Sequence, residues 1–264
     1  MKILVPTDFS SHARTALEFA LCLFGKFKPE IILLNTWQIP HTGTGMLVSI
    51  EDLLREDAER AMSELLTEFV AERGNDADFR ALVKEGSLVE VIKGLNRKEA
   101  FDYIIMGTTG SDDVRKKLLG SNTANVLRTS SVPVIVIPDG TRCEAPHKIS
   151  LATDYQPLQP TAAEHIGKFA TLSDATFEAV HVHQEVIVGG VEEKRINIGG
   201  RDSVVVHVQA PSVSEGLDAY LNNHGSDMLI IVRRDYGFIE RIFHKSVSRA
   251  LAMHTQTPLL IIPE

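Results

Sequence analysis

The sequence is poor in the residues that mark several classes of protein. It has two cysteines, Cys22 and Cys143, among 264 residues, too few for the disulfide framework of a small secreted domain. No apolar run approaches the roughly 20 residues that a membrane-spanning helix needs, and the N-terminal MKILVPTDFS lacks the pattern of a signal peptide. We therefore expect a cytoplasmic protein with no membrane partner, in which Cys22 lies in the core.

An excess of positive charge is also absent. Lysine and arginine number 27 against 35 aspartates and glutamates, which gives a formal net charge of −8. Because a phosphate backbone is bound by a basic surface, this balance argues against a nucleic-acid partner. Hydrophobic residues make up 44% of the chain, enough for a packed globular core.

The chain contains an internal repeat. KILVPTDFSSHARTALEF, which starts at Lys2, aligns without a gap on KISLATDYQPLQPTAAEH, which starts at Lys148, at an offset of 146 residues. Farther on the offset is 125, as between Ser87 and Ser212, so the second copy is 21 residues shorter (146 − 125). A repeat of this length predicts two domains of one fold. The predicted division is a first domain at 1–138, a polar linker at 139–147 and a second domain at 148–264.

Short apolar runs alternate with segments of helical periodicity in the first copy. The predicted strands lie at 2–7, 30–37, 78–86, 101–107 and 132–138, and the predicted helices at 10–27, 49–73, 87–100 and 121–130. This alternation predicts an α/β fold of two tandem, open, mostly parallel five-stranded sheets with helices on both faces. In such a sheet a ligand binds at the carboxyl ends of the strands.

A glycine-rich stretch follows the fourth predicted strand. GTTGSDDVRKKLLGSN, at 107–122, has Gly107, Gly110 and Gly120, followed by Ser121. Glycine lets the backbone approach a phosphate closely, and a helix N-terminus offers unpaired N–H groups. The stretch therefore predicts a polyphosphate site, the alternative being that these glycines only form turns. The pattern is not that of a P-loop.

The whole chain resembles a tandem universal stress protein. The resemblance rests on VPTDFS after the first strand, on the glycine stretch with its trailing serine, and on the closing VPVIVIP. It implies a Rossmann-like, ATP-binding (or ADP- or AMP-binding) protein of the stress response, with Mg²⁺ beside the phosphates. Its implied binding residues are Pro6, Thr7, Asp8, Thr36, Met106, Gly107, Thr108, Gly110, Gly120, Ser121, Asn122 and Thr123.

Two of these assignments have simpler alternatives. Asp8, implied to face the adenine and ribose side with Thr36, could instead be only the N-cap of the first helix. Lys116 and Lys117 could reach phosphates, but a solvated face of the loop is the preferred interpretation.

The second copy departs from the glycine pattern. Val232, Asp235 and Lys245 stand where the first copy has glycines, although Asp154 is kept. We therefore predict one nucleotide site per chain, in the first copy. Arg233, Arg234 and Lys245 could bind a different anion, but a solvated basic face is the preferred interpretation. The long second helix is replaced by EVIVGGVEEKRINIGG, which is more typical of a hairpin.

Three histidines of the second copy could gather on one sheet face. His181 and His183 alternate along one predicted strand, and His207 lies on the expected neighbouring strand. Three imidazoles suit zinc. Histidines satisfied by hydrogen bonds are the preferred alternative.

Three functions fit these observations. The first is a nucleotide-binding regulator with a protein partner that the sequence does not name. The second is a slow ATPase or phosphotransferase, although no nucleophile–base pair accompanies the glycines and no catalytic residue is predicted. The third is a dimerisation module with a vestigial site. The terminal strands at 132–138 and 257–263 are expected to pair as an intrachain pseudo-dimer, and the chain could also form a homodimer.

Overall fold

The computed structural model describes residues 1–38, 47–73, 76–108, 119–185, 193–234 and 257–264. Several positions singled out in the sequence lie outside these ranges, among them Gly110, Lys116, Lys117, Asp235 and Lys245.

The first half of the chain alternates strands and helices as predicted. Ser10 and Ser87 begin helices because their hydroxyls accept hydrogen bonds from the backbone three residues on, at 3.2 Å from Ala13 N and 3.4 Å from Glu90 N. The elements are β1 (Lys2–Pro6), α1 (Ser11–Phe24), a 3₁₀ turn η1 (Gly25–Phe27), β2 (Glu30–Trp37), α2 (Leu47–Arg73), β3 (Asp78–Glu85), α3 (Leu88–Lys98), β4 (Tyr103–Gly107), α4 (Ser121–Thr129) and β5 (Val134–Ile137).

Within its described residues, the second half follows the same order of strands and helices up to β10, with one change. Instead of a long second helix it has a short strand that pairs antiparallel with the next, through a turn in which Gly199 and Gly200 have φ of 57° and 88°. The elements are β6 (Lys148–Ala152), α5 (Pro160–Leu172), β7 (Thr176–His183), β8 (Arg195–Ile198), β9 (Arg201–Gln209), α6 (Val213–His224), β10 (Met228–Arg233) and β11 (Leu259–Pro263).

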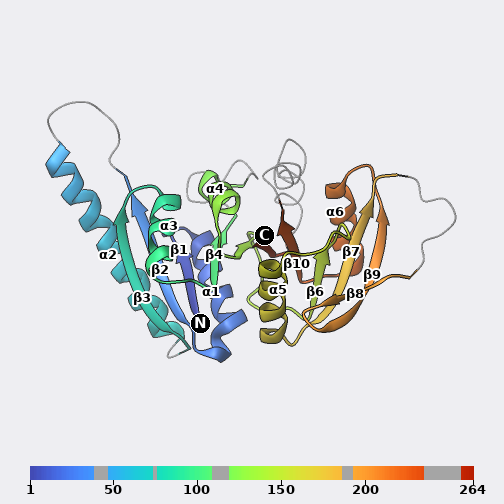
Figure 1. Cartoon of the computed structure of the whole chain (residues 1–264). Coiled ribbons are helices and arrows are strands. Elements are labelled where there is room, and N and C mark those ends of the chain that lie inside the picture. The colour runs from blue at the N-terminus through green and yellow to red at the C-terminus, as the bar shows by residue number, and fades with distance from the viewer. Residues whose placement is uncertain (39–46, 74–75, 109–118, 186–192, 235–256) are drawn as a thin grey trace.

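The two halves share one continuous sheet (Figure 1). Its order is β3-β2-β1-β4-β5-β11-β10-β6-β7-β9-β8, and β5 pairs antiparallel with β11 so that Val134 lies opposite Ile261. All pairs within the first half are parallel. The terminal apolar strands therefore lie in the middle of an 11-stranded sheet, and the second half adds β8 to the five strands that the repeat predicts.

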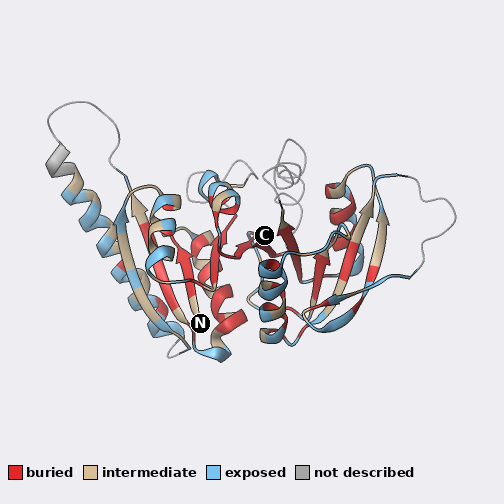
Figure 2. Cartoon of the chain, viewed as in Figure 1, coloured by how far each residue is buried: buried red, intermediate tan, exposed pale blue. Residues whose placement is uncertain are grey.

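Helices cover both faces of this sheet, and each face has its own core (Figure 2). One core joins buried side chains of α1, α2 and α5 to strand residues such as Ile3 and Val5. The other joins side chains of α3, α4 and α6 to the intervening residues, such as Leu4. Because successive strand residues point to opposite faces, both sets must be apolar, which explains the continuous apolar runs of β1, β4 and β5.

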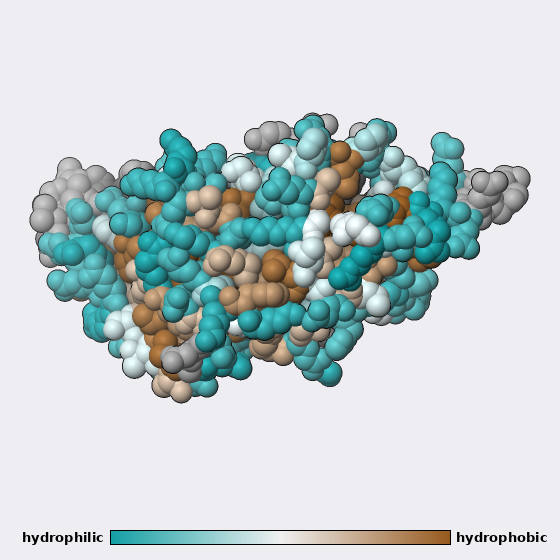
Figure 3. Space-filling model, turned by 60° about the horizontal axis from the view of Figure 1, so that its bottom comes forward, coloured by the Kyte–Doolittle hydropathy of each residue, from teal (hydrophilic) through white to brown (hydrophobic). Residues whose placement is uncertain are grey.

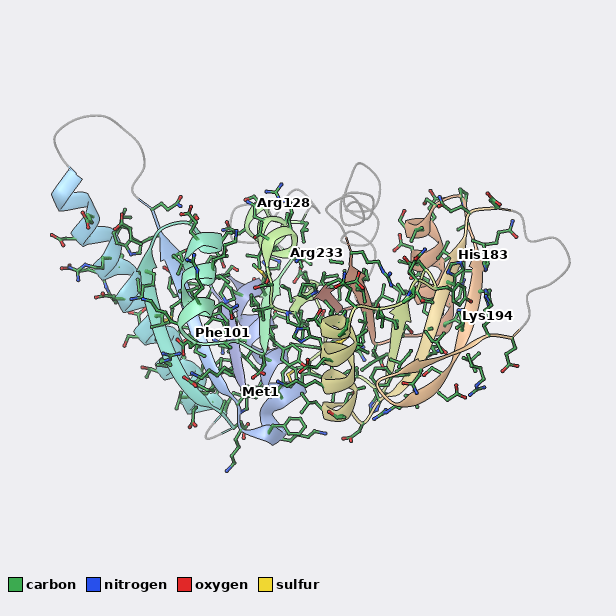
Figure 4. The ribbon with its side chains drawn as sticks, in the orientation of Figure 1. Met1, Phe101, Arg128, His183, Lys194 and Arg233 are labelled. Atoms are coloured by element: carbon green, nitrogen blue, oxygen red, sulfur yellow. A yellow bond between two sulfur atoms is a disulfide. The ribbon has the colours of Figure 1, made fainter. Side chains whose placement is uncertain are left out.

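An arginine of the second half caps the C-terminus of a helix of the first half. Arg233, the last residue of β10, donates from its guanidinium to the carbonyl oxygens of Leu127 and Ser130, at 2.5 Å each (Figure 4). A cation at the C-terminus of α4 satisfies carbonyls that the helix leaves unpaired. The interpretation of Arg233 as part of a solvated basic face is therefore wrong.

Aromatic side chains also join the halves near the chain's N-terminus. The ring of Phe169 on α5 lies edge-on to Tyr103 and Phe24, with centroids 6.0 and 6.4 Å away, and those two rings stack on each other at 4.9 Å. Lys26 Nζ lies 2.6 Å from Asp174 Oδ2 beside this cluster. Aromatic pairs of this geometry stabilise a fold by more than the burial of their surface area alone.

None of the helices in the described residues is long and apolar enough to cross a bilayer. The face toward the amino ends of the strands is mostly hydrophilic, with small, scattered hydrophobic areas (Figure 3).

The two cysteines differ from the sequence-based expectation. Cys22 is only partly buried, and it forms a disulfide with Cys143, with Cα atoms 5.7 Å apart. The interpretation of Cys22 as a core residue without a disulfide is therefore wrong. No local sequence pattern predicts this disulfide, because 121 residues separate the two cysteines. The disulfide attaches the segment that joins the halves to α1.

We expect a Cys143→Ser variant to unfold more easily than the oxidised parent. A cross-link over 121 residues restricts the unfolded chain, and its loss lowers the free energy of unfolding by about 2–4 kcal/mol. Urea titrations of both proteins, with and without dithiothreitol, measure this difference. The reductant should affect only the parent, and two titratable thiols in the untreated native parent would contradict the prediction.

Candidate functional site

The turn after β1 is held by its own side chains. Thr7 Oγ1 accepts from Phe9 N at 3.0 Å, and Asp8 Oδ1 accepts from Ser10 N at 3.1 Å. Phe9 has φ of 65°, an uncommon value for a non-glycine residue. The N-cap of α1 is Ser10 and not Asp8, so the simpler interpretation of Asp8 as that cap is wrong.

The start of α4 is attached to the end of β4. Gly120 N donates to the Thr108 carbonyl at 2.7 Å, and the hydroxyl of Thr123 donates to the Gly107 carbonyl at 2.9 Å. Because β4 lies beside β1 in the sheet, these bonds place the N-terminus of α4 at the carboxyl ends of the strands. The structure thus joins the two ends of the glycine stretch.

The N-terminus of α4 has no side-chain cap. Its N-cap is Gly120, and no side chain makes the capping bond. Ser121 and Asn122, the first two residues of the helix, are exposed. An uncapped first turn offers backbone donors and a partial positive charge to an anion.

Gly107 lies closely against α1, a contact that the sequence does not reveal. A Cβ added at this position would lie 3.1 Å from both the Cβ and the carbonyl oxygen of His12 on α1, closer than ordinary van der Waals contact. The absence of a side chain therefore lets α1 pack against the end of β4. From the sequence alone, we interpret Gly107 as a residue that lets the backbone approach a phosphate.

The predicted binding residues divide into buried and accessible groups. Asp8, Ser121 and Asn122 are exposed, while Thr36 and Gly120 are half-buried. Gly110 lies outside the described residues. The buried members are Pro6, Thr7, Met106, Gly107, Thr108 and Thr123.

The second half builds the same turn after β6. Tyr155 N donates to Thr153 Oγ1 at 3.1 Å, Gln156 N donates to Asp154 Oδ1 at 3.0 Å, and Tyr155 has φ of 62°. The same atoms bond at equivalent positions, 146 residues after the first turn. The repeat therefore preserves this backbone shape, although the glycine stretch is not preserved.

Each turn is also bonded by a side chain of the neighbouring strand, an asparagine in the first half and a histidine in the second. Asn35 Nδ2 donates to the Thr7 carbonyl at 2.8 Å, and His181, at the equivalent position, donates from Nδ1 to the Thr153 carbonyl at 2.7 Å. His181 thus has a structural role. The internal repeat aligns it with Asn35, but the histidine pattern alone does not predict this hydrogen bond.

An arginine neutralises the aspartate of the second turn. Arg234 Nη2 lies 3.4 Å from Asp154 Oδ1, and the guanidinium donates to the carbonyls of Gln156 and Pro157 at 2.8 and 3.1 Å. It also lies 3.7 Å from Glu264 Oε2. The interpretation of Arg234 as a solvated cation is therefore wrong.

The three candidate metal-binding histidines do come together. The rings of His181 and His183 have centroids 4.5 Å apart, and His183 Nε2 lies 2.8 Å from His207 Nδ1. Tyr155 Oη lies 3.2 Å from His207 Nε2. Within the described parts of the chain, no group of three or more His, Cys, Asp or Glu residues is arranged to hold a metal ion. Each of the three imidazoles has a hydrogen-bond partner in the structure.

Burial lowers the pKa of both His183 and His207, and neighbouring positive charges, including Lys194, lower each pKa further. Figure 4 shows His183 and Lys194 on the same outer side of the second half. Because the folded protein disfavours the protonated rings, their contribution to stability is complete above the unfolded pKa of about 6.5. It is lost as the pH falls from there through the lower folded pKa values.

We expect the melting temperature to fall as the pH is lowered from 6.5 toward 5, and to fall less in a His207→Val variant. Valine stands at the equivalent place in the sheet of the first half, where Val83 pairs with Asn35 as His207 pairs with His181, so the replacement suits the fold. Calorimetric melting of both proteins across this range measures the difference. An identical pH dependence in the two proteins would show that these histidines do not contribute to it.

Comparisons with known proteins identify relatives of this chain. A model of the universal stress protein family matches residues 1–138. A universal stress protein of Methanocaldococcus jannaschii is 30% identical over 156 residues, covering 52% of this chain and 93% of that protein. A second universal stress protein of the same organism is 27% identical over 142 residues, covering 52% of this chain and 81% of that protein.

Solved structures match the whole chain. The crystal structure of a universal stress protein from Archaeoglobus fulgidus covers 100% of this chain and 96% of its own, with a TM-score of 0.72 and 20% identity. A structure of unknown function from Pseudomonas aeruginosa covers 99% of this chain and 92% of its own, with a TM-score of 0.60 and 15% identity. These likenesses show that both halves, in their joint arrangement, form a known fold.

Proposed function

The chain belongs to the universal stress protein family, and from that premise we propose that residues 1–138 form a domain that binds one adenine nucleotide in a stress-response regulator. Residues 148–264 would then form a second domain that keeps the scaffold without the nucleotide site, joined through 139–147. The proposal includes the cytoplasm as the protein's location.

The observation that carries this proposal is the uncapped N-terminus of α4 at the end of β4. Gly120 and the exposed Ser121 and Asn122 are suited to the phosphates, because backbone N–H groups and a hydroxyl donate there. Asp8 and Thr36, at the ends of β1 and β2, are suited to the base and ribose. ATP would bring Mg²⁺, which supplies charge neutralisation between phosphate oxygens.

The proposed role is regulation by binding. The residues that surround the start of α4 bind and orient an anion, but they do not include a nucleophile paired with a general base among those that the structure describes. ATP, ADP or AMP would therefore stabilise the domain and change its contacts with a protein partner.

The full chain purified without added nucleotide provides the first test. Denaturation followed by mass spectrometry is expected to release an adenine nucleotide, and calorimetry with ATP, with and without Mg²⁺, is expected to show tighter binding with the metal. Phosphate release no faster than that of heat-denatured protein would support a regulator over a slow ATPase. Absence of binding to ATP, ADP and AMP would overturn the proposal and favour a dimerisation module.

A further inference from the structure

A cavity of about 260 Å³ lies in the second half, at the carboxyl ends of β6, β7 and β10. We propose that it binds an uncharged, flat ring compound of one or two fused rings that carries no phosphate. The proposal concerns the described residues of the second half that line this cavity and does not depend on the nucleotide site of the first half.

The cavity accompanies a change in how the helix meets the sheet. In the first half, Gly107 lets α1 approach β4 so closely that an added Cβ would lie 3.1 Å from His12. Val232 replaces that glycine, and Leu158 replaces that histidine. The helix α5 begins at Pro160, three residues later than the repeat offset would place the start of α1. The missing first turn leaves room for the Val232 side chain, and both Leu158 and Val232 line the cavity.

The lining is predominantly apolar, and its apolar residues come from both faces of the sheet. Its apolar members include Leu151, Leu158, Val180, Val182, Leu217 and Val232. Apolar walls favour a ligand that gives up little hydration on entering. A cavity of roughly 150 Å³ accommodates benzene, so about 260 Å³ is large enough for two fused rings.

The charged side chains among the described lining residues are paired with each other. Asp154 and Arg234 are 3.4 Å apart, and Arg234 also bonds two backbone carbonyls. A phosphate would compete with these partners for the guanidinium, and it would be repelled by the Asp154 carboxylate. The pairing therefore favours an uncharged ligand, in contrast to the uncapped helix of the first half.

Flat polar groups border the apolar walls. The rings of Tyr155 and His181 have centroids 4.5 Å apart, and both residues line the cavity with Asn197. The Nδ1–H of His181 is used by the Thr153 carbonyl, which leaves Nε2 as the atom that can bond a ligand. These aromatic faces suit the face or edge of a ring, and the imidazole and the amide suit its N–H or O–H groups.

Indole is a suitable probe, added to the full chain in the presence of saturating ATP so that the nucleotide site of the first half is occupied. We expect amide NMR shifts that saturate with indole and are concentrated at β6, β7 and α6. Tryptamine and indole-3-acetate, which add a positive and a negative charge, are each expected to bind at least fivefold more weakly. Shifts confined to the first half, or tighter binding of either charged analogue, would overturn the proposal.

A filled cavity provides the matched variant. Val213→Phe places a larger side chain at the first residue of α6, which lines the cavity, and is expected to weaken indole binding at least tenfold. Val204→Phe makes the same change at a side chain on β9 that is 38% exposed and outside the lining, and should leave the affinity unchanged. Melting curves confirm that both variants fold. Equal indole affinity in folded Val213→Phe and Val204→Phe would refute the assignment.

Discussion

A Gly120→Val variant is expected to bind no ATP in a calorimetric titration in which the parent binds about one ATP per chain. The valine side chain would occupy the space at the N-terminus of α4 where the proposed phosphates approach the backbone. Lost hydrogen bonds between charged phosphate oxygens and backbone donors cost several kcal/mol in total, enough to remove measurable binding.

The backbone at Gly120 makes this variant informative. Its φ of −59° and ψ of 147° are values that any residue adopts, so valine should not strain the chain. Gly94→Val is the matched control, because a side chain added at Gly94 on α3 meets no atom within 4 Å. It should retain both the fold and one ATP. Unchanged ATP affinity in Gly120→Val would show that the nucleotide lies elsewhere, and two ATP per parent chain would show that the second half also binds it.

Local patterns in the sequence were sufficient to predict the elements but not all of their contacts. The alternation of short apolar runs with segments of helical periodicity correctly predicted the α/β fold, because these signals act within a few residues. The disulfide between Cys22 and Cys143 joins residues that are distant in sequence. It depends on where the segment after β5 runs along α1, which no local pattern specifies.

The candidate site shows the same division. The spacing of the glycine stretch predicted a helix N-terminus beside a strand end, and the structure places α4 there. The sequence could not show that Gly107 also lies against α1, because that contact joins elements that are distant in sequence. It also treated Arg233 and Arg234 alike as surface cations. The fold gives them separate partners, one across the two halves and one beside Asp154.

The pairing of β5 with β11 leads to the largest expected loss of stability. Val134 and Ile261 lie directly opposite each other and are 1% and 2% exposed. A chain with both Val134→Lys and Ile261→Lys would bury two like charges at the middle of the sheet. Burying an unpaired charge is costly, and like charges directly opposite destabilise a strand pair. We expect the free energy of unfolding to fall by more than about 4 kcal/mol, and the surviving folded molecules to have a larger radius of gyration in small-angle X-ray scattering.

The charge-complementary pair Val134→Lys with Ile261→Glu separates the cross-strand contact from the burial of polar groups. It makes equally drastic changes to β5 and β11, but it lets the two side chains form an ion pair where the lysines would repel. Its free energy of unfolding should exceed that of the Lys–Lys pair by at least about 1 kcal/mol, and its radius of gyration should stay closer to the parent's. If the two double variants unfold at the same urea concentration and scatter alike, Val134 and Ile261 do not face each other in solution. The contacts that join the two halves would then include Arg233, the Lys26–Asp174 ion pair and the aromatic cluster of Phe24, Tyr103 and Phe169, which neither double variant changes.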